Sequence, residues 1–321
     1  MGTMRAVVID GTGGPDVLHV SEVERPQRVN AEFLVKVVAA SVNPIDAKSR
    51  AGKGASAAFG PYPVVLGNDF SGIVVESSYD SHPIKAGDEV YGMTMVPRFG
   101  GAYAEYITVP ATCLARKPRS LSHVEAAAVP LAALTAWGAV VDVAKAHEGQ
   151  VMLIHAGAGG VGHFAIQFAK FFGAHVITTG STRNSSWLRE LGASEVIDYS
   201  TTRFEDSVSK VDVVIDLIGN VSDNTGTRSL GVLKPGGLIV NIPTGSWPTL
   251  AEDAAAAGVR SSGYRVPADG STLAVISRLL ESGDVRVFVD QVFDLDKASD
   301  AHVALETGHT RGKIVLKVSD G

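Results

Sequence analysis

The glycines near the middle of the chain constrain its fold more than any other feature. An apolar run of strand length, 151–155, leads into Gly157, Gly159 and Gly162, which have the spacing Gly-x-Gly-x-x-Gly. A helix-like stretch, 163–172, follows at once. A dinucleotide site requires this order, because the phosphates bind to free N–H groups at the positive end of the helix. The junction therefore predicts a dinucleotide-binding unit; a glycine-rich turn without a ligand is the alternative.

Each glycine of this turn has an expected role. We expect Gly157 to permit the tight turn out of the strand and Gly162 to let the helix pack closely on it. Gly159 has no Cβ, so the backbone there can approach a pyrophosphate. The residues expected to contact the cofactor are Gly157, Ala158, Gly159, Gly160, Val161 and Gly162.

Acidic residues are absent where an NAD site would place one. In such a site an Asp or Glu about 20 residues after the glycines binds the ribose 2′-hydroxyl. Between His163 and Arg189 the chain has no Asp or Glu, and the predicted strand 175–179 runs into a polar turn. Hydroxyl, guanidinium and amide groups suit a 2′-phosphate, which a carboxylate would repel. We therefore expect NADP(H), held by Ser181, Thr182, Arg183 and Asn184. Alternatively, Arg183 only caps or solvates the helix expected at 185–191.

The pattern of hydrophobic residues divides the chain. The first third has short β-branched and apolar runs between Gly, Pro, Asn and Asp, which predicts a barrel-like domain; its strands are expected at 5–9, 33–40, 72–76, 89–93 and 103–109. Ser122 and Glu125 form a capping-box pattern ahead of an Ala-rich helix. Apolar strands and helices then alternate, which predicts a buried parallel sheet covered on both faces. We expect its strands at 151–155, 175–179, 195–197, 211–217 and 238–242, and helices at 162–172, 185–191 and 227–233. A further helix is expected at 272–280, followed by a return to β structure.

Composition excludes several classes of protein. The net charge is −6 and no basic stripe is present, so nothing indicates a nucleic-acid partner. The single cysteine, Cys113, excludes an internal disulfide framework and is expected to be a small buried hydrophobe. No secretory signal is recognisable at the N-terminus, and the apolar run 126–141 is too short to span a bilayer. We therefore expect a cytoplasmic protein with no membrane partner.

Five segments, in order, resemble the medium-chain dehydrogenase/reductase superfamily, in its zinc-free quinone-oxidoreductase branch. They are 39–46, 62–72, 126–137, the glycine turn and 308–316. The resemblance implies an α/β protein in which a GroES-like β-barrel catalytic domain is split across both termini. A Rossmann domain with a doubly wound parallel sheet lies between the two parts and binds the cofactor. The expected bounds are 1–122 and 267–321 for the catalytic domain and 123–266 for the Rossmann domain.

Zinc ligands are missing where zinc-dependent members of that superfamily carry them. Those members have Cys at the position of Asn43, Gly-His-Glu at 67–69 and a second Cys near Leu131, whereas this chain has Asn, Gly-Asn-Asp and Leu. A catalytic zinc needs Cys, His or carboxylate ligands at three converging positions, so no metal is expected. Without a Lewis acid, hydride delivery to an already electrophilic quinone or enone is favoured over alcohol dehydrogenation.

Asn43 matches the active-site asparagine of the resembled family. Its amide could hydrogen-bond a carbonyl or the ribose and stabilise charge that develops as hydride arrives. The alternative is a turn residue before Pro44. Asp46 is expected to orient this loop rather than to titrate.

Two more side chains are catalytic candidates by the same resemblance. Thr135 resembles the threonine beside the nicotinamide; alternatively, its hydroxyl bonds back within a helix. Tyr62 is a candidate proton donor or ring-stacking residue, although family tyrosines lie slightly earlier, where this chain has Lys48 and Gly54. Water is the alternative proton donor. Arg98 and Phe99 are candidates for lining the substrate pocket.

Further cofactor contacts are expected at the ends of later strands. Tyr199 resembles the tyrosine near the adenine ribose. Ligands of open α/β sheets bind at the carboxyl ends of the strands, so we also expect contacts from Ile218, Gly219, Ile242 and Pro243. His155 is expected to be a packed histidine.

These residues predict an NADPH-dependent oxidoreductase that transfers hydride to a quinone or an α,β-unsaturated carbonyl without zinc. A trans-acting enoyl reductase of a biosynthetic pathway and a non-catalytic NADPH-binding protein are the alternatives, since fold does not fix function. The resemblance also implies a homodimer, because members of that family pair the edge strands of two Rossmann sheets. Here residues 258–264 are expected to supply that edge, since exposed strands tend to pair.

Overall fold

The structure is a computed structural model that describes residues 2–97 and 100–320. The chain forms two compact units, one made of Met1–Leu134 with Pro267–Gly321 and the other of Thr135–Val266. The sequence placed the first boundary after residue 122. In the structure the intervening stretch belongs to the first unit, where α2 (His123–Ala127) packs against strands of its sheet.

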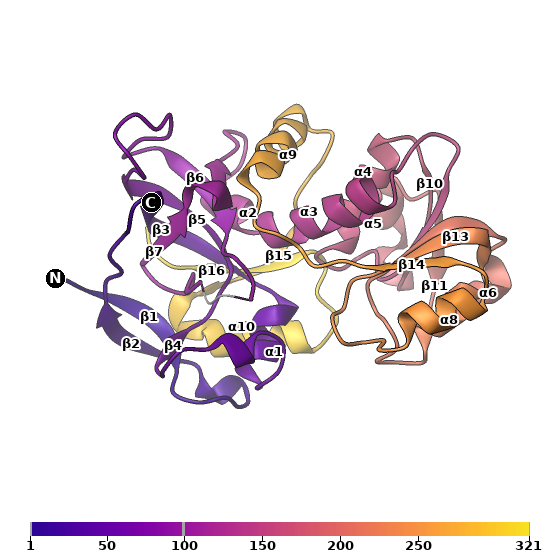
Figure 1. Cartoon of the computed structure of the whole chain (residues 1–321), viewed down its shortest axis with the longest axis horizontal. Coiled ribbons are helices and arrows are strands. Elements are labelled where there is room, and N and C mark those ends of the chain that lie inside the picture. Colours follow the sequence, from indigo (N-terminus) through magenta and orange to yellow (C-terminus); the bar gives the residue numbers. More distant parts are fainter. Residues whose placement is uncertain (1, 98–99, 321) are drawn as a thin grey trace. The chain divides into compact units, whose positions relative to one another are not determined.

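Two sheets build the first unit (Figure 1). The smaller has the order β2–β1–β4, and the larger has the order β15–β16–β3–β5–β6–β8, with β7 also paired to β3. The strands are β1 (Thr3–Ile9), β2 (His19–Glu24), β3 (Glu32–Val42), β4 (Val64–Val65), β5 (Asp69–Glu76), β6 (Glu89–Met93), β7 (Tyr106–Pro110), β8 (Leu114–Arg116), β15 (Val289–Asp294) and β16 (Lys313–Lys317). The antiparallel pairing of β16 with β3 sets Ile314 opposite Val42, which brings the end of the chain beside the Asn43 loop.

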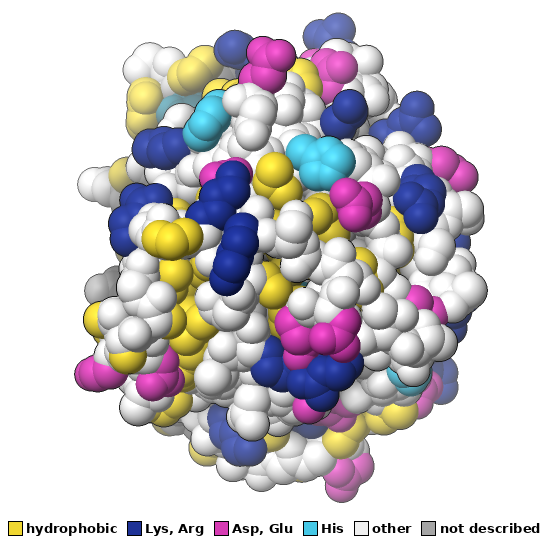
Figure 2. Space-filling model, turned by 90° about the vertical axis from the view of Figure 1, so that its right-hand side faces the viewer, with side chains coloured by type: hydrophobic (Ala, Val, Ile, Leu, Met, Phe, Trp, Pro, Cys, Tyr) yellow, Lys and Arg dark blue, Asp and Glu magenta, His cyan; other side chains and the backbone are white. Residues whose placement is uncertain are grey.

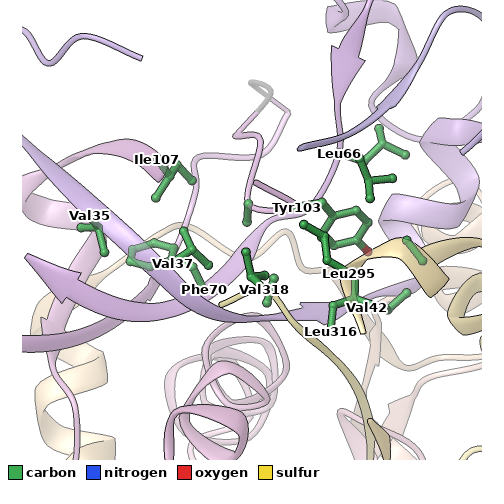
Figure 3. Close-up of a cluster of buried hydrophobic side chains, with 14 of the residues drawn as sticks. Val35, Val37, Val42, Leu66, Phe70, Tyr103, Ile107, Leu295, Leu316 and Val318 are labelled. Atoms are coloured by element: carbon green, nitrogen blue, oxygen red, sulfur yellow. The ribbon is translucent and has the colours of Figure 1, made fainter. Parts of the chain in front are cut away.

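The core of this unit is a cluster of buried apolar side chains from several strands. Figure 3 shows Val37 of β3 and Phe70 of β5 in this cluster, together with Leu316 of β16. Tyr103 is fully buried in the same cluster and points its hydroxyl toward a polar interior. Burial of these side chains is the main stabilising contribution, at about 25 cal/mol for each Å² of apolar surface. Cys113 is buried here as the sequence predicted.

The sequence predicted only some of the helices that accompany these sheets. They are α1 (Pro44–Arg50), α2, α9 (Gly270–Ser282), α10 (Ala298–Glu306) and the first part of α3 (Pro130–Trp137), whose last residues belong to the second unit. Ser122 caps α2 through the predicted capping box with Glu125. The sequence analysis missed α1, although Pro44 at the first turn and Asp46 three residues after Asn43 are helix-start signals.

The second unit is a parallel sheet with the order β11–β10–β9–β12–β13–β14. Its strands are β9 (Val151–Ile154), β10 (His175–Gly180), β11 (Glu195–Asp198), β12 (Val211–Asp216), β13 (Leu233–Asn241) and β14 (Arg260–Gly263). In chain order this is the 3-2-1-4-5-6 arrangement of a doubly wound dinucleotide-binding fold. In Figure 1, α4 (Gly162–Phe171) and α5 (Ser185–Glu190) lie on one face and α8 (Leu250–Ala256) on the other. Two more helices are α6 (Phe204–Ser207) and α7 (Thr225–Leu230).

One helix in this unit was placed too late by the sequence pattern. The expected helix 227–233 is α7, which ends at Leu230, because Leu233 already pairs with Val211 as the start of β13. The apolar character of Leu230 and Leu233 continues the helical pattern, although only Leu230 belongs to the helix.

The surface carries charges of both signs. Figure 2 shows acidic and basic side chains interspersed over one face of the molecule. Among the described residues, none of the helices has the length and apolar character needed to cross a membrane.

Candidate functional site

The glycine turn joins β9 to α4 with little room for side chains. A Cβ at Gly162 would lie 2.3 Å from the Ala156 carbonyl oxygen, and one at Gly157 would lie 2.1 Å from Thr178 Oγ1. At Gly159 a Cβ would meet only the Ala156 oxygen, at 3.4 Å. Gly162 and Gly157 therefore permit close packing, whereas Gly159 leaves its backbone open to a ligand. Ala156 has the positive φ at this turn, 51°, while Gly157 contributes by lacking a Cβ.

The turn is held to the end of β10. The Ala156 and Gly157 N–H groups donate to Oγ1 and the carbonyl oxygen of Thr179, at 3.1 and 3.0 Å. His155 is buried between Thr179 and Ser229, whose Oγ atoms lie 3.3 Å from its Nδ1 and 2.9 Å from its Nε2. Burial lowers the pKa of His155 to about 4. His155 is thus a neutral, packed side chain, as expected.

The residues expected around a 2′-phosphate follow β10. They form a short 3-10 turn, Thr182–Asn184, in which Asn184 Nδ2 donates to Ser181 Oγ at 3.2 Å. Sequence reasoning missed a neighbour of this turn. Asp198, at the end of β11, accepts hydrogen bonds from Thr182 Oγ1 and from the Ser200 N–H and hydroxyl. The hydrogen bonds from Ser200 and then Thr182 lower the pKa of Asp198 to about 2, so a full negative charge borders the turn.

The remaining cofactor candidates lie at the same edge of the sheet. Asp216, buried at the end of β12, accepts from the N–H groups of Ile218 and Gly219 at 3.0 and 2.8 Å and from Asn241 Nδ2 at 2.8 Å. The Ile242 N–H donates to the Asp216 carbonyl at 3.0 Å, and Pro243 follows. The carboxylate thus fixes the loop that follows its strand, beside the end of β13. Tyr199, which follows β11, is 60% exposed.

In the first unit, Asn43 lies in a buried polar cluster. Its Nδ2 donates to Asp69 Oδ2 at 2.9 Å, and its Oδ1 accepts from Lys313 Nζ. An ammonium only donates and an ionised carboxylate only accepts, so this pairing fixes the orientation of the amide. All three side chains are at most 3% exposed. The Asn43 amide is therefore already hydrogen-bonded on both sides within the protein.

Asp69 has several more donors. Ser41 Oγ lies 2.7 Å from its Oδ2, and the Leu131 N–H lies 2.8 Å from its Oδ1. Lys313 Nζ lies 3.8 Å from Oδ2. Burial raises the pKa of Asp69 and lowers that of Lys313, while their mutual attraction opposes both shifts. Two of the positions expected to lack zinc ligands meet here at Asp69, through the Asn43 amide and the Leu131 backbone N–H, and Lys313 adds an ammonium that the sequence analysis did not include.

Asp46 ties the Asn43 loop to the neighbouring segment. Its Oδ2 accepts from the Asn43 N–H at 2.9 Å and the Tyr103 hydroxyl at 3.3 Å, and its Oδ1 accepts from Asn68 Nδ2 at 2.6 Å. These contacts are those of a residue that orients the loop. Burial, as the largest cause, raises the pKa of Asp46 to about 7, so it also titrates near neutrality, which the sequence analysis did not expect.

The other catalytic candidates have different surroundings. Tyr62 is 44% exposed, and its ring contacts Phe59 edge to face with centroids 6.3 Å apart. Thr135 is buried on α3 and belongs to the second unit. Arg98 and Phe99 lie outside the described residues. Within 2–97 and 100–320, no three His, Cys, Asp or Glu side chains form a group that could hold a metal ion.

Two families match large parts of the chain. Residues 29–119 match the family described as "Alcohol dehydrogenase GroES-like domain". Residues 191–316 match the family described as "Zinc-binding dehydrogenase". The first match lies within the first unit, whereas the second begins in the second unit and continues past Val266 into the part of the first unit that starts at Pro267.

Individual proteins are similar over nearly the whole length. The "2-methylene-furan-3-one reductase" of Solanum lycopersicum is 38% identical over 98% of this chain and 79% of its own length. The "NADPH-dependent alkenal/one oxidoreductase, chloroplastic" of Arabidopsis thaliana is 37% identical over the same shares. The solved structure of the quinone oxidoreductase from Coxiella burnetii is 39% identical with a TM-score of 0.94, covering 99% of this chain and 100% of that one. With its GroES-like unit and Rossmann unit, the chain belongs to the quinone-oxidoreductase branch of the medium-chain dehydrogenase/reductase superfamily.

Proposed function

We propose that the protein is an NADPH-dependent reductase that transfers hydride to a quinone or an α,β-unsaturated carbonyl without zinc. The observation that carries this proposal is the open backbone at Gly159, in a turn between β9 and α4. Relatives named as enone and quinone reductases support the substrate class.

The cofactor residues divide into three groups along the carboxyl edge of the second unit's sheet. The turn from Gly157 through Ala158, Gly159, Gly160 and Val161 to Gly162 would hold the pyrophosphate at the start of α4. Ser181, Thr182, Arg183 and Asn184 would hold the 2′-phosphate, and Tyr199 would lie against the adenine ribose. Ile218, Gly219, Ile242 and Pro243 would flank the nicotinamide half. Bound NADPH supplies the hydride from nicotinamide C4.

The catalytic candidates act by orientation and charge stabilisation. Because both sides of the Asn43 amide are engaged, we favour a role in which Asn43 positions the loop around the reacting groups over one in which it alone binds an oxyanion. Thr135 would lie beside the nicotinamide, and Tyr62 would stack on or protonate the substrate. Water remains the alternative proton donor.

In this proposal the protein uses no zinc, because of the residues it has at the positions where zinc-dependent members of the superfamily carry ligands. Amides such as Asn43 and Asn68 and the Leu131 backbone do not replace Cys or His as zinc ligands. The acceptor must then be electrophilic on its own. Conjugated quinones and enones meet that requirement, and simple ketones and alcohols do not.

A substrate panel tests the proposal. Purified protein is mixed with NADPH and a quinone, an enone, an enoyl thioester or a simple ketone, and NADPH oxidation is followed. Turnover of the quinone or enone is expected. Turnover of the enoyl thioester alone would favour a trans-acting enoyl reductase, and NADPH binding without any turnover would favour a non-catalytic protein. Turnover of the ketone with equal efficiency would contradict the zinc-free assignment.

We also propose a homodimer in which two copies pair at β14, the strand at one edge of the second unit's sheet. A monomeric mass at micromolar concentration would contradict it.

A cytoplasmic location is proposed from the single cysteine, Cys113, which suits a reducing compartment. Cell fractionation tests it, and enrichment in an organelle would overturn it.

A further inference from the structure

A chain of buried polar groups runs from α10 to the Asn43 loop within the first unit. His302 on α10 is fully buried, with its Nε2 3.2 Å from the Tyr103 hydroxyl and its Nδ1 3.1 Å from Arg50 Nη1. The Tyr103 hydroxyl lies in turn 3.3 Å from Asp46 Oδ2. These hydrogen bonds connect three segments that are far apart in the sequence: α1, the segment around Tyr103, and α10.

The chemistry of the groups fixes which of them donates and which accepts in each of these hydrogen bonds. A guanidinium has no acceptor, so His302 Nδ1 accepts from Arg50 and the ring proton of a neutral His302 resides on Nε2. Burial and the Arg50 charge lower the pKa of His302 to about 3, which keeps the ring neutral. His302 Nε2–H therefore donates to Tyr103, and the Tyr103 hydroxyl can donate only onward, to Asp46.

Two residues of this hydrogen-bonded series, Arg50 and Tyr103, are held in place. Arg50 also donates to Glu306 Oε1 at 2.6 Å and to the Gly13 carbonyl at 3.2 Å, so its guanidinium cannot easily turn away. The Tyr103 ring packs so closely on the backbone that a Cβ at Gly67 would lie 2.3 Å from Tyr103 Cδ1. The hydroxyl is therefore held in one place beside Asp46.

We propose that Tyr103 and His302 are positioning residues, which fix the Asp46 carboxylate and through it the backbone N–H of Asn43 at the start of α1. This inference rests on the proposed function, because the Asn43 loop matters for hydride transfer only if it borders the reacting groups. Neither Tyr103 nor His302 is expected to touch substrate or cofactor.

Two tyrosine variants form a matched pair for the test. Tyr103→Phe removes the hydroxyl and keeps the ring. Tyr91→Phe is the control, because Tyr91 is equally buried in the same unit but donates to the Leu273 carbonyl and contacts Ser277, away from the chain. Both variants are expected to lose similar thermal stability. Only Tyr103→Phe should lower kcat, and the decrease should be about 10-fold, which is the scale of one lost hydrogen bond to a charged group. The affinity for NADPH should not change in either variant.

The pH profile separates positioning from simple destabilisation. Asp46 faces Tyr103, and the charges of Asp69 and Lys313 act on it as well. Loss of the Tyr103 donor removes a hydrogen bond from ionised Asp46 and so raises its pKa above the wild-type value. The acid limb of the kcat profile should therefore move to higher pH in Tyr103→Phe and stay in place in Tyr91→Phe.

A readout without activity keeps this inference separate from the proposed function. Amide hydrogen exchange at Asn43 should become faster in Tyr103→Phe and not in Tyr91→Phe, whether or not the protein reduces quinones. In addition, His302→Gln retains an N–H donor and should keep kcat closer to wild type than His302→Leu. Equal effects of the two tyrosine variants on kcat and on Asn43 exchange would overturn the inference. If the wild type does not reduce quinones or enones but Asn43 exchange is still faster in Tyr103→Phe than in Tyr91→Phe, only the proposed function is overturned.

Discussion

Gly180 and Asp198 lie opposite each other on the paired parallel strands β10 and β11. This register brings the Asp198 carboxylate to the hydroxyl of Thr182, in the turn proposed to hold the 2′-phosphate. The acidic residue that the sequence lacked at the end of β10 is therefore supplied by the next strand. Its charge opposes a phosphate, so the preference for NADPH over NADH should be smaller than Arg183 alone would give.

Replacement of Asp198 by Asn should strengthen NADPH binding several-fold and leave NADH binding within about twofold, because only the phosphate is repelled by the carboxylate. Fluorescence titration of both cofactors measures this. The gain should shrink as salt is added, since Asp198 lies near solvent and its charge is screened. An equal gain for NADH would contradict the assignment.

Removal of the Arg183 guanidinium should have the opposite effect. Arg183→Ala is expected to weaken NADPH binding by about 1–3 kcal/mol, the scale of a lost charged hydrogen bond, with NADH nearly unchanged. Isothermal titration with each cofactor is the measurement. Equal losses for both would remove Arg183 from the 2′-phosphate site.

The Asn43 amide is the next target. Asn43→Ala should lower kcat/KM by roughly 10- to 1,000-fold, because the loop loses the contacts that position it; the upper end of this range is the effect of losing one oxyanion donor. NADPH affinity should change less, because the proposed phosphate contacts are in the second unit. Asn43→Asp should be less stable than Asn43→Ala, because it sets another carboxylate against Asp69. Wild-type kcat/KM in Asn43→Ala would leave Asn43 as a helix cap alone.

Metal analysis tests the zinc-free assignment. Protein prepared without chelators is expected to contain no stoichiometric zinc, because Asn43 and Asn68 stand where zinc-dependent relatives have ligands, and Lys313 places a positive charge beside Asn43 and Asp69. Activity should withstand dialysis against a chelator. One zinc per chain, with activity lost on its removal, would reopen alcohol dehydrogenation.

His155 should make stability depend on pH in a defined direction. Its pKa falls from 6.5 to about 4 on folding, so the unfolded chain takes up the proton first as the pH drops. The contribution of neutral His155 to the free energy of unfolding is therefore present in full above pH 6.5. It falls as the pH drops toward 4, by at most about 1.4 kcal/mol per pH unit. The difference in unfolding free energy between wild type and His155→Gln should therefore shrink from pH 7 to pH 4. A constant difference across this range would contradict burial of a neutral histidine.

The sequence located the parts of the fold whose signals are local. The apolar runs that became β9, β10 and β12 were placed within one or two residues, because a buried parallel strand needs side chains that are apolar on both faces. Helix α1 was missed because Asn43-Pro44 was weighed as a turn and not as a helix cap. Strand β2 has exposed charged residues on alternate positions, and α8 is only seven residues long and consists mostly of alanine, so neither stands out.

The contacts that complete the site are not local. Lys313 lies 270 residues after Asn43, and only the pairing of β16 with β3 brings them together. Asp198 escaped notice because its register partner, Gly180, belongs to another strand. A spacing rule along one segment cannot anticipate a neighbour that sheet pairing supplies.

The position of Lys313 also has a consequence for the order in which the protein is made. A ribosome delivers Asn43, Asp46 and Asp69 early, and the whole Thr135–Val266 unit leaves it before β16 exists. Until then the nascent chain holds two carboxylates that burial would penalise, with no ammonium beside them. The polar cluster can thus close only after β16 has been synthesised, and a chain that stalls short of β16 would carry an intact dinucleotide-binding unit and a catalytic unit that cannot complete its core.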